Sequence, residues 1–356
     1  MTQVTPAGPM SSRRDCGTQD GLTELIQCAI GRVHDQQARS GTPIADFRFG
    51  DFVLGVRAQL GRAIAELTTM FDHHRVRDTP RTALLDIIDG PDAALAPLQP
   101  SPRTGRDRVV LSTAAVYCLW DPEGGGKLTA VDREKCLGVV WYPAATALPS
   151  WEKARPLIHA FKALFPASRL MPVHGAAVAL GEHGILIAGG GGAGKTTMAL
   201  ACVEAGWRYV GDDGVLIGGA PLRAFNLFRS ARLREDMFTR LPHSLTATYT
   251  ISTDSGEVKA ELDVGRLPSA AIGDAIVSAI VVPRRMGSPG IVIAPLRQSV
   301  ALRELSATTL VALPGDTSES YEFMAHALRG VQCFSVDPGP VLGAVPAALE
   351  RLAAGG

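Results

Sequence analysis

The sequence predicts an α/β protein in which a mixed α/β module precedes a second α/β domain built around a phosphate-binding loop. Two observations support this prediction. Apolar residues at helical spacing recur along the chain between short apolar runs that are typical of strands. One such run, residues 184–188, leads into a glycine-rich loop and then into good helix formers, which is the order that a phosphate loop requires. We expect a disordered tail at residues 1–18, the N-terminal module at 19–165 and the loop-containing domain at 166–356.

The composition excludes several classes of protein. The 356 residues include 35 Lys plus Arg and 35 Asp plus Glu, so the chain lacks the basic excess that nucleic-acid binders use against phosphates. No stretch has the apolar character of a signal peptide or a membrane span. The 6 cysteines show no Cys-x-x-Cys spacing, so neither a zinc site nor a redox motif is indicated. We therefore expect a cytoplasmic protein with no nucleic-acid partner and no membrane partner.

The N-terminal module is expected to begin with a helix and to continue mainly as strands. From Leu22 to Val33 the apolar residues fall on one helical face. Residues 47–58 then alternate in the manner of strands around a glycine turn. Residues 109–141 predict further strands joined by a tight turn, and residues 151–164 return to helical spacing.

Two strings in this module imitate functional motifs. GGGK at 124–127 resembles part of a phosphate loop, but no Ser or Thr follows it and no strand-to-helix context surrounds it. A hairpin turn is the expected structure there. Asp72, His73 and His74 are residue types that bind metals, yet adjacent histidines in a charged segment are typical of a solvated surface. We therefore assign neither string to a site.

The sequence from Gly189 to Thr196 satisfies the phosphate-loop pattern G-x-x-x-x-G-K-[ST]. Glycines let the backbone bring its N–H groups to phosphate oxygens, and the following helix directs its positive dipole end at the same anion. In such a loop Lys195 reaches the β and γ phosphates of ATP, and the Thr196 hydroxyl is a ligand of Mg²⁺. The expected nucleotide-binding residues are Gly189, Gly190, Gly191, Gly192, Ala193, Gly194, Lys195, Thr196 and Thr197.

Two carboxylates are expected beside this loop. A helix from Thr196 to about Ala205 is about 15 Å long, and a strand over residues 207–210 returns over a similar distance. The strand therefore ends level with the loop, at the sheet edge where open α/β sheets bind ligands. Asp212 and Asp213 follow the strand, so they can hold Mg²⁺ and accept a proton there.

Flanking segments add further candidates. The turn at 181–184 separates two apolar runs, which predicts a hairpin beside the phosphate-loop strand. His174 stands at the far end of that hairpin and can reach the same rim. Residues 275–285 predict a buried strand that ends in Arg284 and Arg285. An arginine there can stabilise charge during phosphoryl transfer, although arginines are more commonly surface residues.

Together, HGAAVAL, ILIAGGGGAGKTT and GWRYVGDDGVLI resemble the catalytic domain of HPr kinase/phosphorylase, most specifically over about residues 170–220. The fold of that family is related to ATP-dependent phosphoenolpyruvate carboxykinase. The resemblance implies a P-loop domain of this kind that acts as an ATP- and Mg²⁺-dependent kinase with an alcohol acceptor. It assigns Asp213 as the base, His174 as the residue that orients it, and Lys195 to the phosphates. It places Asp212 with Thr196 in the magnesium shell.

The sequence also departs from that family. The family's Leu-Glu-Ile-Arg-Gly-type signature, which helps to engage the protein substrate and bind metal, is absent, and RAFNLFRSARLREDMF stands in its place. HPr is therefore not the expected substrate. The layout is more similar to HPr kinase-like proteins encoded with peptide-modification systems, including lasso-peptide clusters. This similarity implies that the acceptor is a serine of a peptide or small protein, such as a biosynthetic precursor peptide, and related kinases assemble as oligomers.

Other functions stay open on the sequence. A kinase of the same fold could phosphorylate a hydroxyl of a metabolite, with the N-terminal module capping a small pocket. The chain could instead bind ATP as a scaffold or switch that has no acceptor. The sequence also leaves open which of Asp212 and Asp213 is the base and which lies with the metal.

Overall fold

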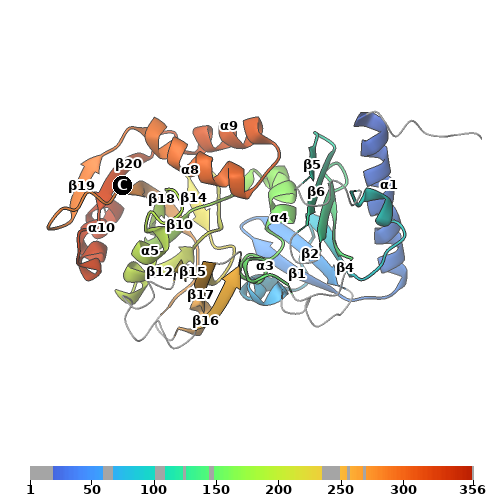
Figure 1. Ribbon diagram of the computed structural model, residues 1–356, viewed down its shortest axis with the longest axis horizontal. Coiled ribbons are helices and arrows are strands. Elements are labelled where there is room, and N and C mark those ends of the chain that lie inside the picture. The colour runs from blue at the N-terminus through green and yellow to red at the C-terminus, as the bar shows by residue number, and fades with distance from the viewer. Residues whose placement is uncertain are drawn as a thin grey trace, which may run out of the picture.

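The computed structural model describes residues 19–58, 67–100, 109–122, 126–143, 148–234, 249–254, 257–267 and 270–354 (Figure 1). The tail expected at 1–18 lies outside the described residues. The helices are α1 (Gln19–Arg39), α3 (Ser150–Ala154), α4 (Ile158–Leu164), α5 (Lys195–Glu204), α8 (Gln298–Ala312), α9 (Thr317–Ala327) and α10 (Val345–Ala354). The strands of the N-terminal half are β1 (Ile44–Phe49), β2 (Phe52–Ala58), β3 (Arg75–Val76), β4 (Ala83–Asp89), β5 (Val109–Ser112), β6 (Val116–Asp121), β7 (Lys127–Asp132) and β8 (Leu137–Tyr142). Those of the C-terminal half are β9 (Leu170–Val173), β10 (Ala176–Leu180), β11 (His183–Ile187), β12 (Arg208–Gly211), β13 (Val215–Gly218), β14 (Arg223–Phe225), β15 (Ser230–Arg234), β16 (Tyr249–Asp254), β17 (Glu257–Asp263), β18 (Ala275–Pro283), β19 (Val292–Pro295) and β20 (Gln332–Asp337).

The protein is a mixed α/β structure, as the sequence predicts, and its N-terminal strands form one 8-stranded sheet in the order β3-β1-β2-β4-β8-β7-β6-β5. The expected leading helix is α1, which packs on this sheet through Ile26, Ile30 and Val33.

The hairpin expected at GGGK is confirmed, because β6 and β7 pair antiparallel up to Asp121 and Lys127. Residues 123–125 lie outside the described part.

Residues 151–164 are mostly helical, as their apolar spacing predicts, but they form two helices, α3 and α4, with a break between them. Pro156 lies in the break, and a proline both lacks an N–H and disfavours helical geometry in the residue before it. Arg155 accordingly has φ −133° and ψ 61°, and Leu157 has a φ of 60°. Arg155 therefore follows the end of α3 and lies outside both helices.

The main C-terminal sheet has 9 strands, and β11, which leads into the phosphate loop, is one of its inner strands. The expected hairpin is confirmed: β10 pairs antiparallel with β11, and also with β12. Strands β11 and β12 therefore run in the same direction, so their carboxyl ends lie at one edge. Along β11, Ile185 and Ile187 face the layer of α5 and α10, whereas Leu186 faces α8 and α9. A small 3-stranded sheet, β15-β17-β16, completes this half.

An aromatic cluster joins the two halves. Helix α4 lies between the two large sheets (Figure 1), and its Phe161 is fully buried. The Phe161 ring lies 5.4 Å from that of Phe49 in β1 and 5.9 Å from that of Phe228 in the C-terminal half. The shared cluster indicates that the two halves unfold together, although the boundary near residue 165 stays a prediction.

We expect Phe161→Ala to reduce the free energy of unfolding by about 3–5 kcal/mol, because it removes a fully buried ring and leaves a cavity between the halves. Urea denaturation followed by tryptophan fluorescence measures this. Tyr321→Ala is the matched control: that ring is 45% exposed, so its loss should change stability by less than about 0.5 kcal/mol. A loss below about 1 kcal/mol in Phe161→Ala would contradict the role of the cluster.

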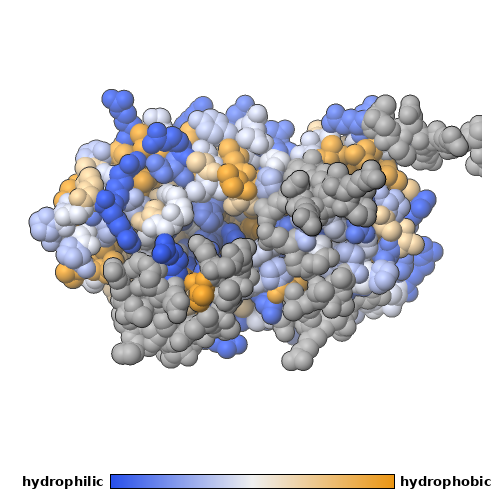
Figure 2. All heavy atoms as spheres, viewed as in Figure 1, coloured by the Kyte–Doolittle hydropathy of each residue, from blue (hydrophilic) through white to orange (hydrophobic). Residues whose placement is uncertain are grey.

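Hydrophobic residues are scattered among hydrophilic ones over the described part of the face shown in Figure 2. Among the described helices, none has both the length and the apolar character needed to cross a membrane.

Candidate functional site

Two connections meet at the edge where β11 and β12 end. His174 and Gly175 connect β9 to β10, and residues 212–214 connect β12 to β13. Strand register explains why the two connections are adjacent, since Val173 of β9 pairs with Val215 of β13 and Ala177 of β10 pairs with Gly211 of β12. The His-Gly linker and the Asp-Asp-Gly turn therefore lie side by side, as the sequence predicts.

The phosphate loop begins at the same edge. Ala176 of β10 pairs with Ile187, the last residue of β11, so the His-Gly linker is also close to the start of the loop. Gly192 and Gly194 have φ values of 73° and 103°, which a side chain would strain. Gly194 caps α5, whose first residue is Lys195. The positive end of the α5 dipole therefore points into the loop.

Lys195 lies at the centre of the loop. Its ammonium donates hydrogen bonds to the carbonyl oxygens of Gly189, at 2.9 Å, and Gly190, at 3.1 Å. The side chain is buried, with 6% exposure. The loop backbone therefore holds the Lys195 ammonium close to the start of α5. A positive charge at this place suits the binding of an anion.

Asp212 and Thr196 contact each other directly. The Thr196 hydroxyl donates to both carboxylate oxygens of Asp212, at 2.9 and 2.8 Å, and the Arg232 backbone N–H donates to one of them at 3.3 Å. Asp212 is only 1% exposed, and burial together with the neighbouring Asp213 charge raises its pKa.

These two residues fit a magnesium ion. They bring a hydroxyl and a buried carboxylate together beside the phosphate loop, and Mg²⁺ prefers oxygen ligands. Within the described residues, no group of three or more His, Cys, Asp or Glu side chains could hold a metal. A site of one hydroxyl and one carboxylate that is completed by phosphate oxygens and water is the usual form for Mg²⁺.

Asp213 and His174 form the second pair of the site. His174 Nε2 lies 3.8 Å from Asp213 Oδ1, and both side chains are partly exposed to the pocket. Burial opposes the charge of Asp213, but Arg155, His174 and Lys195 outweigh it and lower the Asp213 pKa. Burial lowers the pKa of His174 to about 4, so the ring is neutral at pH 7. Thr309 holds the linker, because its Oγ1 accepts a hydrogen bond from the His174 backbone N–H at 3.0 Å.

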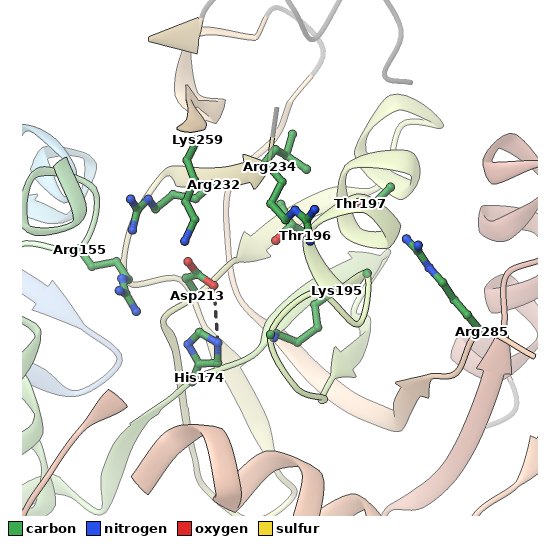
Figure 3. Close-up of a pocket in the computed structure, with 14 residues that line it drawn as sticks. Arg155, His174, Lys195, Thr196, Thr197, Asp213, Arg232, Arg234, Lys259 and Arg285 are labelled. Carbon is green, nitrogen blue, oxygen red and sulfur yellow. Dashed lines mark ion pairs between the residues drawn. The ribbon is translucent and has the colours of Figure 1, made fainter. Parts of the chain in front are cut away.

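A pocket of about 530 Å³ connects these groups (Figure 3). The predicted residues that line it are His174, Gly191, Gly192, Gly194, Lys195, Thr196, Thr197 and Asp213. Gly189, Gly190, Ala193 and Asp212 are not in the lining, although Asp212 reaches the site through Thr196. The two candidate arginines separate: Arg285 lines the pocket, whereas Arg284 forms an ion pair with Glu304 at 3.3 Å.

Sequence reasoning missed the four other cationic residues of the pocket, which are Arg155, Arg232, Arg234 and Lys259. Arg155 comes from the break between α3 and α4. The segment noted as a departure from the family supplies Arg232 and Arg234 through β15, and β17 supplies Lys259. The many arginines of RAFNLFRSARLREDMF were the sequence feature that could have indicated Arg232 and Arg234 as pocket residues.

The histidine pair at residues 73 and 74 is not in the pocket. His73 Nε2 lies 2.6 Å from Asn226 Oδ1, and His74 Nε2 lies 3.3 Å from the same oxygen. Asp72 pairs instead with Arg75 at 2.7 Å. Asp72 and His73 are exposed and His74 is partly exposed, as the sequence predicts, and the two histidines also contact the C-terminal half through Asn226.

The chain matches no family model, and a search of curated proteins finds no match. The functional proposal therefore depends on the residues and the geometry of the site.

Proposed function

We propose that the protein is an ATP- and Mg²⁺-dependent kinase that transfers the γ-phosphoryl group to a hydroxyl, and that the acceptor is a serine of a peptide or small protein. The observation that carries the proposal is the meeting of a phosphate loop with the Asp212–Thr196 and Asp213–His174 pairs at one sheet edge. The proposal includes the finer fold assignment, an HPr kinase-like P-loop domain in the C-terminal half.

The loop residues bind the nucleotide. Backbone N–H groups of the loop and the start of α5 hold the phosphate oxygens. Lys195 moves its donated hydrogen bonds from the loop carbonyls to the β and γ phosphates. Arg285 lines the same part of the pocket and adds a second positive charge. Thr196 and Asp212 would hold Mg²⁺, which when bound neutralises phosphate charge.

Asp213 acts on the acceptor. Its lowered pKa keeps the carboxylate ionised at neutral pH, so it accepts a hydrogen bond from the acceptor hydroxyl and orients it. The serine Oγ forms a bond to Pγ, the bond from Pγ to the β–γ bridging oxygen breaks, and the hydroxyl proton passes to Asp213. ADP leaves with its new charge paired to Lys195. His174 contacts Asp213 and fixes its orientation.

A metabolite kinase of the same fold is the second candidate. One observation favours it: Arg155, which precedes the C-terminal half, lines the pocket. The N-terminal module therefore contributes to the pocket wall, as expected of a module that caps a pocket for a small alcohol.

The test is direct phosphotransfer. We expect that the full chain, incubated with Mg²⁺ and γ-labelled ATP, labels serine peptides from a mixed panel and forms one ADP for each phosphoserine. Mass spectrometry identifies the labelled residue, and the same panel with threonine and alanine in place of serine is the control. Small alcohols are tested under the same conditions, and labelling of these alcohols but of no peptide would support the metabolite kinase. Tight ATP binding with neither hydrolysis nor transfer would overturn the kinase proposal in favour of a scaffold.

A further inference from the structure

We distinguish two parts of the pocket. The first is the phosphate-loop side, where Figure 3 shows Lys195 and Arg285. The second surrounds Asp213, with Arg155 on the side opposite Lys195 and with Lys259 above the Asp213 carboxylate. The first part holds the nucleotide in the function proposed above. The second part must then hold the acceptor, because Asp213 touches the acceptor hydroxyl in that mechanism.

The small sheet turns a basic face toward the pocket. Strands β15 and β17 pair Arg232 with Glu261 and Arg234 with Lys259. Residues two apart in a strand share a face, so these four side chains lie on one face of the sheet. Glu261 forms an ion pair with Arg232 at 3.2 Å. The described part of this face therefore presents three cations and one carboxylate.

Arg155 extends this basic face from the other half of the protein. Its Nε is buried and has no hydrogen-bond partner, and no carboxylate of the described residues forms an ion pair with its guanidinium. A buried guanidinium nitrogen without a hydrogen-bond partner costs free energy, which an anionic ligand in the pocket would offset. Asp213 does not take that place, although it is close enough for Arg155 to lower its pKa.

The nucleotide does not account for these charges. The magnesium complex of ATP carries a net charge of about −2, which Lys195, Arg285 and the helix dipole of α5 can balance. Figure 3 shows Arg155 on the opposite side of Asp213 from Lys195, so the phosphates held by the loop do not account for the Arg155 charge.

We infer that the acceptor carries an anionic group, a carboxylate or a phosphate, beside the hydroxyl that is phosphorylated, and that Arg155 and Lys259 bind this group. The inference rests on the proposed kinase function and names the substrate class of the same site. In a peptide, the group is an acidic residue that flanks the serine. In a small molecule, it is a phosphate or carboxylate on the alcohol itself. Arg155 belongs to the N-terminal module, so this module would take part in binding the acceptor.

The experiment compares acceptors that differ only in charge. One arm uses serine peptides with Glu on both sides of the serine and the same peptides with Gln. The other arm uses glycerol 3-phosphate against glycerol, so that the two arms distinguish a peptide from a small molecule. At saturating MgATP, we expect kcat/KM for the anionic member of the productive pair to exceed that for the neutral member by about tenfold or more.

Variants of Arg155 then test the residue itself. We expect Arg155→Met to reduce the preference for the anionic acceptor by about tenfold, mainly through KM for the acceptor, with KM for ATP close to that of the wild type. Arg155→Lys keeps the charge and should restore part of the preference. Arg284→Met is the matched control, because it removes the same charge from a residue outside the pocket and should keep the full preference. If Arg155→Met does not fold, Lys259→Met tests the same subsite.

Several outcomes would overturn the inference. Equal kcat/KM for the charged and neutral members would show that no anion is recognised. An equal loss for both members in Arg155→Met and in Lys259→Met would show that these residues act only on Asp213 or on the nucleotide. ATP binding without phosphorylation of any acceptor would overturn the kinase function itself, and this result is distinct from equal phosphorylation of charged and neutral acceptors.

Discussion

Lys195→Met is expected to reduce phosphotransfer by about three orders of magnitude while the fold is retained. The ammonium donates to two loop carbonyls and lies where the loop and the start of α5 converge. In the proposed mechanism it pairs with charge that develops on the bridging oxygen in the transition state, so its loss should affect kcat as well as nucleotide affinity. Methionine keeps most of the side-chain volume in this 6% exposed position, so the loop should keep its packing.

The measurement is initial rate of γ-phosphoryl transfer over a range of ATP concentrations, with nucleotide binding followed separately by calorimetry. Lys135→Met is the matched control, because that lysine is 61% exposed, lies outside the pocket and forms an ion pair with Asp132 at the end of β7. The control should keep the wild-type rate. A Lys195→Met protein that retains more than about a tenth of the wild-type rate would show that the loop does not act on phosphates as proposed.

The parts of the fold that local sequence determines were predictable. Strand β11, the loop and α5 follow one another without interruption, and their residue types are required by backbone geometry at each step. The same holds for the hairpin β10–β11 and for strand β12, which ends at Gly211, just before Asp212. Gly206, with a φ of 88°, follows α5 where a helix-ending glycine is expected.

The basic part of the pocket was not predictable, because tertiary contacts bring its residues together. Arg155 reaches the site only because Pro156 breaks a segment whose apolar spacing is continuous through the break. Lys259 reaches it because β17 pairs with β15, a contact between residues far apart in the chain. Apolar periodicity contains no information about either event. The net charge of zero likewise gives no indication that positively charged side chains predominate in the pocket lining.

Asp213→Asn is expected to lower kcat by about 10²–10⁴-fold while nucleotide binding is retained. Asparagine keeps the size of the side chain and can still contact the acceptor hydroxyl, but it cannot take the proton. Asp213 has a φ of 57°, a conformation that Asn adopts readily, so the turn should persist. Thr196 and Asp212 keep their own hydrogen bonds, and the phosphate loop is unaltered. The substitution therefore separates the proton-accepting function from nucleotide binding.

Asp78→Asn provides the matched control, because Asp78 is an exposed aspartate with a similar φ of 51° that lies outside the pocket. It should leave kcat and ATP affinity unchanged. The parallel variant Asp212→Asn distinguishes the two carboxylates: it should raise the magnesium concentration needed for half-maximal activity, whereas Asp213→Asn should not. If instead Asp213→Asn changes the magnesium requirement and Asp212→Asn removes only kcat, the two assignments must be exchanged. The neutral His174, 3.8 Å from Asp213, would then lie beside a metal-associated carboxylate, which it would position without competing for its charge.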